Sequence, residues 1–367
     1  MTQCVAKLAA AFALAAALAA GNAAAAGSRT LSDMNSRTVT VPETIRKVVP
    51  LSGALRFLVY MQSLDLVSGM ERIEQRHTAA GRLYGLATRD LARKLPIVGE
   101  GGPGKLPDFE RIIELGPDVI IVMGLDSSQI ANIEQKTGIP VFSLNYGAPG
   151  VLDVQSTRTA LGLLGQLLGR SGRSAQLIAE MDRLEADFAR RTAGLETEDR
   201  QTAYVGAVSL KGVQGITSTD AAYAPLAWAG GKNVAAESGK SGHLFIDPEQ
   251  LLAWNPAILF LDAASLTTIQ EDSRKRADFY QRLQAVQKNQ VYLVMPYNAY
   301  HTNIEIAYAD TYFIGKTLYP YRFQDVDPAA KADEIFQAFI GLRGYEALKK
   351  EYGGFRQMEF GAQHGFR

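Results

Sequence analysis

The segment at residues 297–303 has the side chains most suited to holding a ligand. It reads Tyr297-Asn-Ala-Tyr300-His301-Thr-Asn303, so it combines aromatic rings, an imidazole and amide groups. It follows a short aliphatic run and precedes an amphipathic helical pattern, which predicts a loop between a strand and a helix. Aromatic rings offer stacking surfaces, and the free amides of a helix start attract anions. We therefore predict that Tyr297, Tyr300 and His301 contact a ligand.

Cationic and phenolic side chains in other predicted loops add the chemistry that an anionic metal chelate needs. Arginine binds carboxylate or catecholate oxygens through paired hydrogen bonds. Tyrosine rings could stack on the ligand or, as phenolates, contact iron directly. The remaining predicted ligand-binding residues are Arg56, Arg72, Tyr84, Tyr146, Lys211 and Tyr223.

The same sequence gives no support to a protein-bound metal or to catalysis. His77, His243 and His301 are candidate ligands for a bare transition metal, but they are far apart and form no HxH or HExxH pattern. A GxSxG motif is absent, and GxGxxG occurs only at residues 99–104, where prolines interrupt the helix that a nucleotide site requires. We predict no catalytic residue, no metal site and no cofactor.

The first residues predict export. Lys7 is followed by an apolar run over residues 8–20 and by small residues up to Ala26, which is the pattern of a secretory signal peptide over residues 1–26. Cys4 lies before the apolar run and not after it, where a lipoprotein would have its acylated cysteine. We therefore expect a periplasmic protein without a membrane anchor.

Charge and length limit the remaining classes. The chain has 38 basic and 38 acidic residues, and removal of the leader takes away Lys7 alone, which leaves 37 against 38. Without a basic excess, nucleic acid is not an expected partner. The roughly 340 residues that remain exceed what one core usually organises, so two domains are expected.

Aliphatic runs that alternate with helix-length segments predict an α/β fold with largely parallel sheets. In the first lobe, strands are expected at residues 47–51, 66–69, 118–123 and 140–144, and helices at 54–64 and 127–137. A segment rich in Leu, Ala, Arg and Glu over residues 152–195 predicts a long connecting helix, with a possible break at 169–172. Alternation then resumes, and a final helix with Ile335, Phe339 and Leu342 on one face is expected to close the second lobe. The predicted divisions are a first lobe at 27–150, the connecting helix at 151–196 and a second lobe at 197–367.

An internal repeat relates the two lobes. The segment 108–122 (DFERIIELGPDVIIV) matches 247–261 (DPEQLLAWNPAILFL) in register. In both copies aspartate is placed to cap a short helix, glutamate lies in the first turn, and proline stops the helix before an apolar strand.

The order of these segments resembles the periplasmic binding proteins for ferric siderophores, haem and cobalamin. The resemblance covers nearly all of the chain after the leader. It is carried by residues 47–52 (KVVPLS), 95–99 (LPIVG), 108–122, 137–142 (TGIPVF), 247–261 and 284–292 (QAVQKNQVY). It implies two Rossmann-like lobes joined by a long helix, with the ligand in the cleft between them.

The resemblance also implies the partners. In that family a glutamate on each lobe contacts the membrane permease, which assigns docking to Glu110 and Glu249. We expect a monomer that binds a small-molecule metal chelate, most simply a ferric siderophore with Fe(III), and delivers it to the permease and ATPase of an ABC importer. Open alternatives are a corrinoid or haem, a nickel complex, a molybdate-type oxyanion, a sensor role, or an exported enzyme.

Overall fold

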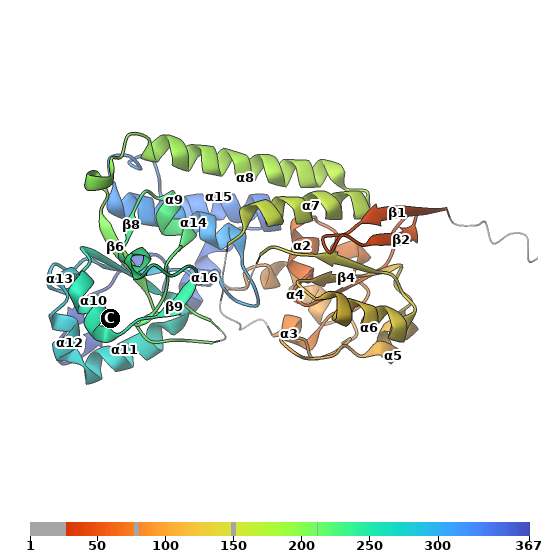
Figure 1. Cartoon of the computed structure of the whole chain (residues 1–367), viewed down its shortest axis with the longest axis horizontal. Helices are drawn as coiled ribbons and strands as arrows, with labels where there is room; N and C mark the ends of the chain where they lie inside the picture. The colour runs from red at the N-terminus through yellow and green to blue at the C-terminus, as the bar shows by residue number, and fades with distance from the viewer. Residues whose placement is uncertain (1–26, 77–80, 148–151, 211) are drawn as a thin grey trace, which may run out of the picture.

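The computed structural model describes residues 27–76, 81–147, 152–210 and 212–367. The predicted signal peptide, residues 1–26, lies outside them. Two α/β lobes lie side by side, and the long helix α8 (Ser171–Thr192) runs across the top of both (Figure 1). Within the described part of the chain, no helix combines the length and apolar character needed to cross a membrane.

The first lobe is built on a parallel sheet with the strand order β3-β4-β5. Every residue of the central strand β4 is buried, as expected of a sheet covered on both faces. An antiparallel pair, β1 and β2, lies at the outer side of this lobe (Figure 1). The elements of this lobe are β1 (Ser28–Ser32), β2 (Thr38–Pro42), β3 (Val48–Leu51), α2 (Leu55–Tyr60), α3 (Arg72–Gln75), α4 (Gly85–Ala92), α5 (Phe109–Leu115), β4 (Val119–Met123), α6 (Ser127–Thr137) and β5 (Val141–Leu144).

The second lobe has a sheet of order β12-β11-β10-β6-β8, in which only β12 is antiparallel to its neighbour. Its central strand β10 is again buried at every residue. The strands are β6 (Thr202–Gly206), β7 (Ser218–Asp220), β8 (Lys232–Asn233), β9 (His243–Phe245), β10 (Ile258–Asp262), β11 (Val291–Val294), β12 (Arg356–Gln357), β13 (Phe360–Gly361) and β14 (Gly365–Phe366). The helices are α9 (Ala224–Trp228), α10 (Pro248–Trp254), α11 (Leu266–Lys275), α12 (Ala277–Gln281), α13 (Gln284–Gln287), α14 (Ile304–Leu318), α15 (Pro328–Ile340) and α16 (Tyr345–Tyr352).

The connecting segment is broken at the predicted place. Helix α7 (Val154–Leu168) ends at Gly169 in a left-handed conformation with φ of 67°, and α8 begins at Ser171. The chain reverses there, so α7 packs along α8 over the first lobe, and α8 continues across to the second lobe (Figure 1). A left-handed glycine is a common helix end because it has no Cβ to clash.

The internal repeat is confirmed in detail. Helices α5 and α10 have the same length, Asp108 and Asp247 each accept a backbone hydrogen bond in the first turn, and both helices end at a left-handed residue, Gly116 or Asn255. A buried five-residue strand follows each of them. The two lobes therefore share a structural unit that local side-chain chemistry specifies.

Hydrogen bonds link the two lobes beneath helix α8. Arg173 of α8 donates to the carbonyl oxygen of Tyr60 on α2 at 2.8 Å and to that of Ala338 on α15 at 2.7 Å. Tyr60 also hydrogen-bonds Glu305 at the start of α14. The lobes are thus connected by buried polar contacts as well as by the chain itself.

Two predicted elements were wrong. Residues 66–69 form no regular strand; Val67 and Met70 make single bridges to Val48 and Ile97, and a 3₁₀ turn precedes them. The helix that was expected to close the chain ends at Ile340, before Leu342, and α16 and three short strands follow it. Gly341 explains the early end because it adopts the left-handed conformation, with φ of 76°.

Candidate ligand-binding site

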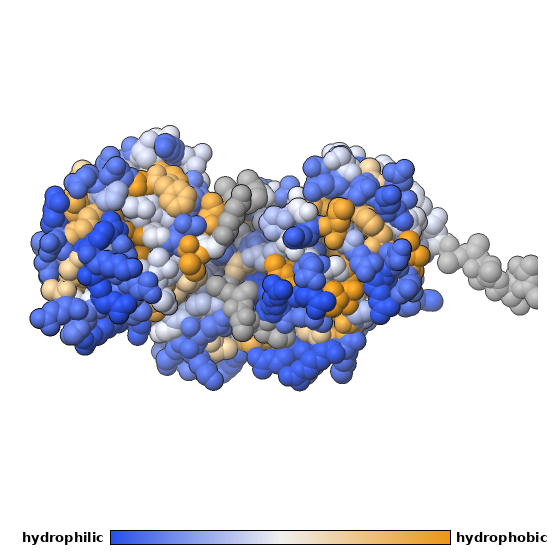
Figure 2. All heavy atoms as spheres, turned by 90° about the horizontal axis from the view of Figure 1, so that it is seen from below, coloured by the Kyte–Doolittle hydropathy of each residue, from blue (hydrophilic) through white to orange (hydrophobic). Residues whose placement is uncertain are grey.

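Apolar surface lies on both lobes where they approach each other on the face opposite α8 (Figure 2). The first lobe has a cavity of about 250 Å³ at the carboxyl ends of β3 and β4. The lining residues are Leu51, Ser52, Glu71, Lys105, Leu106, Pro107, Leu125, Ser128, Gln129, Asn132 and Ile133. The carboxyl edge of parallel strands is where open α/β sheets bind ligands.

The residues directly after β3 form a tight turn whose backbone faces a carboxylate. Ser52 and Gly53 are both left-handed, with φ of 55° and 82°. The Ser52 amide is thereby free of the sheet ladder and hydrogen-bonds the carboxylate of Glu71. Ala207, the residue directly after β6 in the second lobe, is also left-handed, with φ of 61°. Such conformations cost about 1 kcal/mol or more in a residue with a Cβ and concentrate at functional sites.

The second lobe completes this turn with Tyr300. Its hydroxyl donates to Glu71 Oε2 at 2.7 Å, and the Ser52 amide donates to the same oxygen at 2.9 Å. We call these two donors, the amide of Ser52 and the hydroxyl of Tyr300, the anion nest. Burial raises the pKa of Glu71 to about 7, although the hydrogen bond from Tyr300 lowers it.

His301 closes one side of the nest. A Cβ on Gly53 would lie 2.6 Å from His301 Cδ2, so only glycine fits beneath the ring. The Tyr146 ring packs edge-on at 5.0 Å from the imidazole. Burial lowers the pKa of His301 to about 4, and the positive charge of Arg56 acts in the same direction. The imidazole is therefore neutral near pH 7 and suited to hydrogen bonding.

Two other predicted residues lie in the contact between the lobes. Arg56 is fully buried; its Nε donates to Asn303 Oδ1 at 3.0 Å, and its Nη2 donates to the carbonyl oxygens of Ala299 and Tyr300. Tyr84 lies against the guanidinium at 4.8 Å and donates to Glu74 Oε2 at 2.8 Å. Arg56 thereby holds the segment that carries Tyr300, and Tyr84 packs against Arg56.

The remaining predicted residues are dispersed. Tyr223 and Tyr297 are buried in the second lobe with ring centroids 5.4 Å apart, and burial raises the pKa of each well above its ordinary value. Arg72 is exposed and paired with Glu100 at 2.7 Å. Lys211 and His77 lie outside the described residues. The structure thus brings Tyr146, Tyr300 and His301 together, with Arg56 bonded to the carbonyl oxygen of Tyr300.

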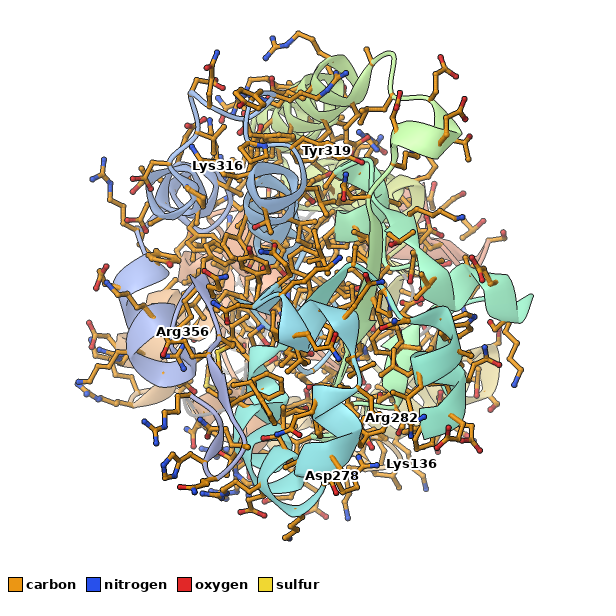
Figure 3. All side chains as sticks on the ribbon, turned by 90° about the vertical axis from the view of Figure 1, so that its left-hand side faces the viewer. Lys136, Asp278, Arg282, Lys316, Tyr319 and Arg356 are labelled. Atoms are coloured by element: carbon orange, nitrogen blue, oxygen red, sulfur yellow. The ribbon has the colours of Figure 1, made fainter. Side chains whose placement is uncertain are left out.

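The two glutamates of the internal repeat are exposed. Glu110 and Glu249 lie in the first turns of α5 and α10. The Glu249 carboxylate is 3.9 Å from the guanidinium of Arg282, which lies on the outer end of the second lobe (Figure 3). With 76% of its side chain accessible, Glu249 remains open to a partner.

Sequence reasoning missed Glu71, the central acceptor of the site. A glutamate in a predicted loop has the pattern of a surface residue, yet Glu71 is 6% exposed. The available signal was the Ser52-Gly53 pair directly after a strand, which is typical of a turn with positive φ. Among the described residues, no group of three or more His, Cys, Asp or Glu side chains is arranged to hold a metal ion.

Comparison with known proteins identifies the family. The model of the family described as periplasmic binding protein matches residues 88–297, more than half of the chain. The chain belongs to this family. It is a periplasmic binding protein of the kind that serves ABC transporters, and it is not an enzyme. Proteins of this kind bind a transported solute and no resident cofactor, and the two α/β lobes are those of the family.

Individual relatives differ in what their names say they bind. The molybdate-binding protein MolA of Haemophilus influenzae is 23% identical over 336 residues, which are 86% of this chain and 92% of the relative. The structure of MolA bound to molybdate superposes with a TM-score of 0.67 at 19% identity, over 86% of this chain and 98% of that one. A protein of the Fe³⁺-hydroxamate transport system from Saccharomonospora viridis matches with a TM-score of 0.54 at 20% identity, over 79% and 99%. These structural likenesses establish the fold.

Proposed function

We propose that this protein captures a small oxyanion of the molybdate type between its lobes and delivers it to an ABC importer. The observation that carries the proposal is the anion nest, in which the amide of Ser52 and the hydroxyl of Tyr300, one from each lobe, converge on one point. Such uncharged, fixed donors suit a compact anion. The similarity to MolA along nearly the whole of both chains supports the same ligand class.

A bulky ferric siderophore, the first expectation from the sequence, has less support. The guanidinium of Arg56 is already engaged by the other lobe, and that of Arg72 is paired with Glu100. Direct iron contacts would need phenolates, but burial raises the pKa of Tyr84, Tyr223 and Tyr300.

A small metal chelate is the second candidate. The cavity beside the nest holds about 250 Å³, and Leu106, Leu125 and Ile133 give it an apolar wall. A carboxylate of the chelate would occupy the nest while its organic part filled the cavity. This candidate differs from the first in requiring the cavity as well as the nest.

We further propose that Glu110 and Glu249 contact the permease. Each is exposed at the first turn of a repeated helix, so the two carboxylates provide one contact from each lobe. Positive side chains on the permease would bind them by charge-assisted hydrogen bonds.

Native mass spectrometry combined with elemental analysis tests the ligand. The protein is purified without chelators from the periplasm of its own cells, and a Tyr300→Phe variant is treated in the same way. We expect about one molybdenum or tungsten atom per chain in the wild type and a lower occupancy in the variant. Iron or nickel with an added organic mass would support the second candidate. A purely organic ligand would refute both.

A further inference from the structure

Glu71 occupies the point at which the proposed oxyanion would bind. Its Oε2 accepts the Ser52 amide at 2.9 Å and the Tyr300 hydroxyl at 2.7 Å. These are all the donors of the nest. A carboxylate offers the negative charge and the oxygen acceptors that an oxyanion would offer, so the two compete for one place.

The fold is shaped to hold this side chain. Glu71 follows Met70, which is fixed by a bridge to Ile97. A Cβ on Gly101 would lie 2.9 Å from Glu71 Cβ and 3.0 Å from its Cδ, so the absence of a side chain at Gly101 makes room for the carboxyl. Gly101 is left-handed, with φ of 72°, which also favours glycine.

The carboxyl also has a place to move to. Ser52 and Glu71 both line the cavity of about 250 Å³. A solute that enters the cavity can therefore reach the nest, and the displaced carboxyl can turn into the same space. Lys105 lines that cavity and offers a positive charge to either anion.

We infer that Glu71 is a built-in competing anion, which fills the nest while the site is empty and leaves it when a solute anion binds. The inference rests on the proposed function, since it assumes that the nest receives the solute. Because Tyr300 belongs to the second lobe, exchange of Glu71 for the solute also exchanges a contact between the lobes. A solute anion must therefore bind the nest more strongly than the Glu71 carboxylate does, and weakly binding anions cannot displace it.

The second lobe has a buried carboxyl in a comparable position that lacks this property. Asp262 accepts the amides of Ser209 at 3.0 Å and Ala264 at 2.9 Å. Both donors belong to its own lobe, and Asp262 is not among the residues that line the cavity. Glu71 therefore differs from an ordinary loop-stabilising carboxyl by its contact with the other lobe and by its access to the cavity.

The ionisation of Glu71 adjusts the competition. Burial raises its pKa to about 7. The groups that act on it are Glu74 of α3, which raises this pKa further, Tyr300 of the 297–303 segment, which lowers it, and Lys105, which lines the same cavity. The competing charge is weaker in mild acid, so solute binding should strengthen as pH falls below 7.

Chemical rescue tests the occupied nest without assuming the identity of the solute. Thermal unfolding of Glu71→Ala is measured with increasing sodium formate. Wild type and Glu100→Gln serve as controls, the latter because it removes an exposed carboxylate nearby. We expect formate to raise the Tm of Glu71→Ala alone, since formate can fill the emptied nest. The absence of a formate effect in this variant would overturn the inference.

Calorimetry with sodium molybdate separates the inference from the proposed function. Glu71→Gln keeps the side-chain volume and removes the charge, so it remains informative if Glu71→Ala folds poorly. We expect molybdate to bind Glu71→Gln about tenfold more tightly than wild type, which is the weight of one charge-assisted hydrogen bond. Equal affinities would overturn the inference and leave the proposed function standing. If formate rescues Glu71→Ala but molybdate binds neither wild type nor Glu71→Gln, the inference stands and the proposed function is refuted.

Discussion

Replacement of Glu71 by glutamine should remove a specific dependence of stability on pH. The carboxyl has an ordinary pKa of 4.5 and a pKa of about 7 in the folded protein. Between these values the folded chain holds a proton that the unfolded chain has lost, so the free energy of unfolding falls as pH rises. Stability from this group is fully present below about pH 4.5 and is lost as pH rises through 7.

The size of the effect follows from the shift. One pKa unit corresponds to 1.36 kcal/mol, so a shift of this size amounts to about 3 kcal/mol between pH 4.5 and 7. Glu71 is only 6% exposed, so solvent does not screen the effect strongly. Other buried carboxyls, such as Asp262 with a raised pKa of about 6, contribute similar slopes. Those contributions cancel when the variant is compared with wild type.

The assay is urea unfolding of wild type, Glu71→Gln and Glu100→Gln at a series of pH values. Far-UV circular dichroism is the suitable signal, because Trp228 and Trp254 both lie in the second lobe. From pH 4.5 to 7, the free energy of unfolding of wild type should fall by about 3 kcal/mol relative to that of Glu71→Gln. Curves that stay parallel over this range would refute the assignment of a buried, proton-binding Glu71.

Substitutions at the turn after β3, at the cap of α10 and at the two exposed glutamates of the repeat should have distinct effects. Gly53→Ala should lower stability by about 2 kcal/mol in urea unfolding, through left-handed strain and contact with His301, and should weaken solute binding in calorimetry. Asp247→Ala should lower the free energy of unfolding by about 1 kcal/mol, because helix α10 loses its cap. Asp247→Asn should retain most of the stability, because asparagine can also cap. Equal losses of stability in the two variants would exclude capping as the cause. The double variant Glu110→Lys, Glu249→Lys should bind solute as wild type does in calorimetry but support little uptake in transport assays. Normal uptake by this variant would remove the docking proposal.

Local rules made much of the fold predictable. Asp108 and Asp247 cap their helices, and Pro117 and Pro256 prevent continuation, so the repeated helix–strand unit could be identified without tertiary information. Gly169 likewise marked the break between α7 and α8. The strand predicted at residues 66–69 was wrong because single bridges, and not a continuous ladder, hold that segment in place.

The site was less predictable because its contacts join distant residues. Tyr300 and Glu71 are separated by 229 positions, and burial of Glu71 depends on their meeting. The side chain of Arg56 bonds the second lobe because α2 packs beside it, and that packing is not visible in the sequence. Within one predicted loop, Tyr297 lies in the core of the second lobe. Tyr300 and His301 adopt left-handed conformations, with φ of 47° and 75° respectively, and contact the first lobe.

Anomalous diffraction from crystals grown with sodium molybdate would locate the bound solute, because molybdenum identifies its own position. We predict a single strong anomalous peak between the lobes, with oxygens in hydrogen-bond reach of the Ser52 amide and the Tyr300 hydroxyl, and with the Glu71 carboxyl turned away. A fully occupied molybdate bound elsewhere, or a nest still filled by Glu71 at saturating molybdate, would contradict this prediction.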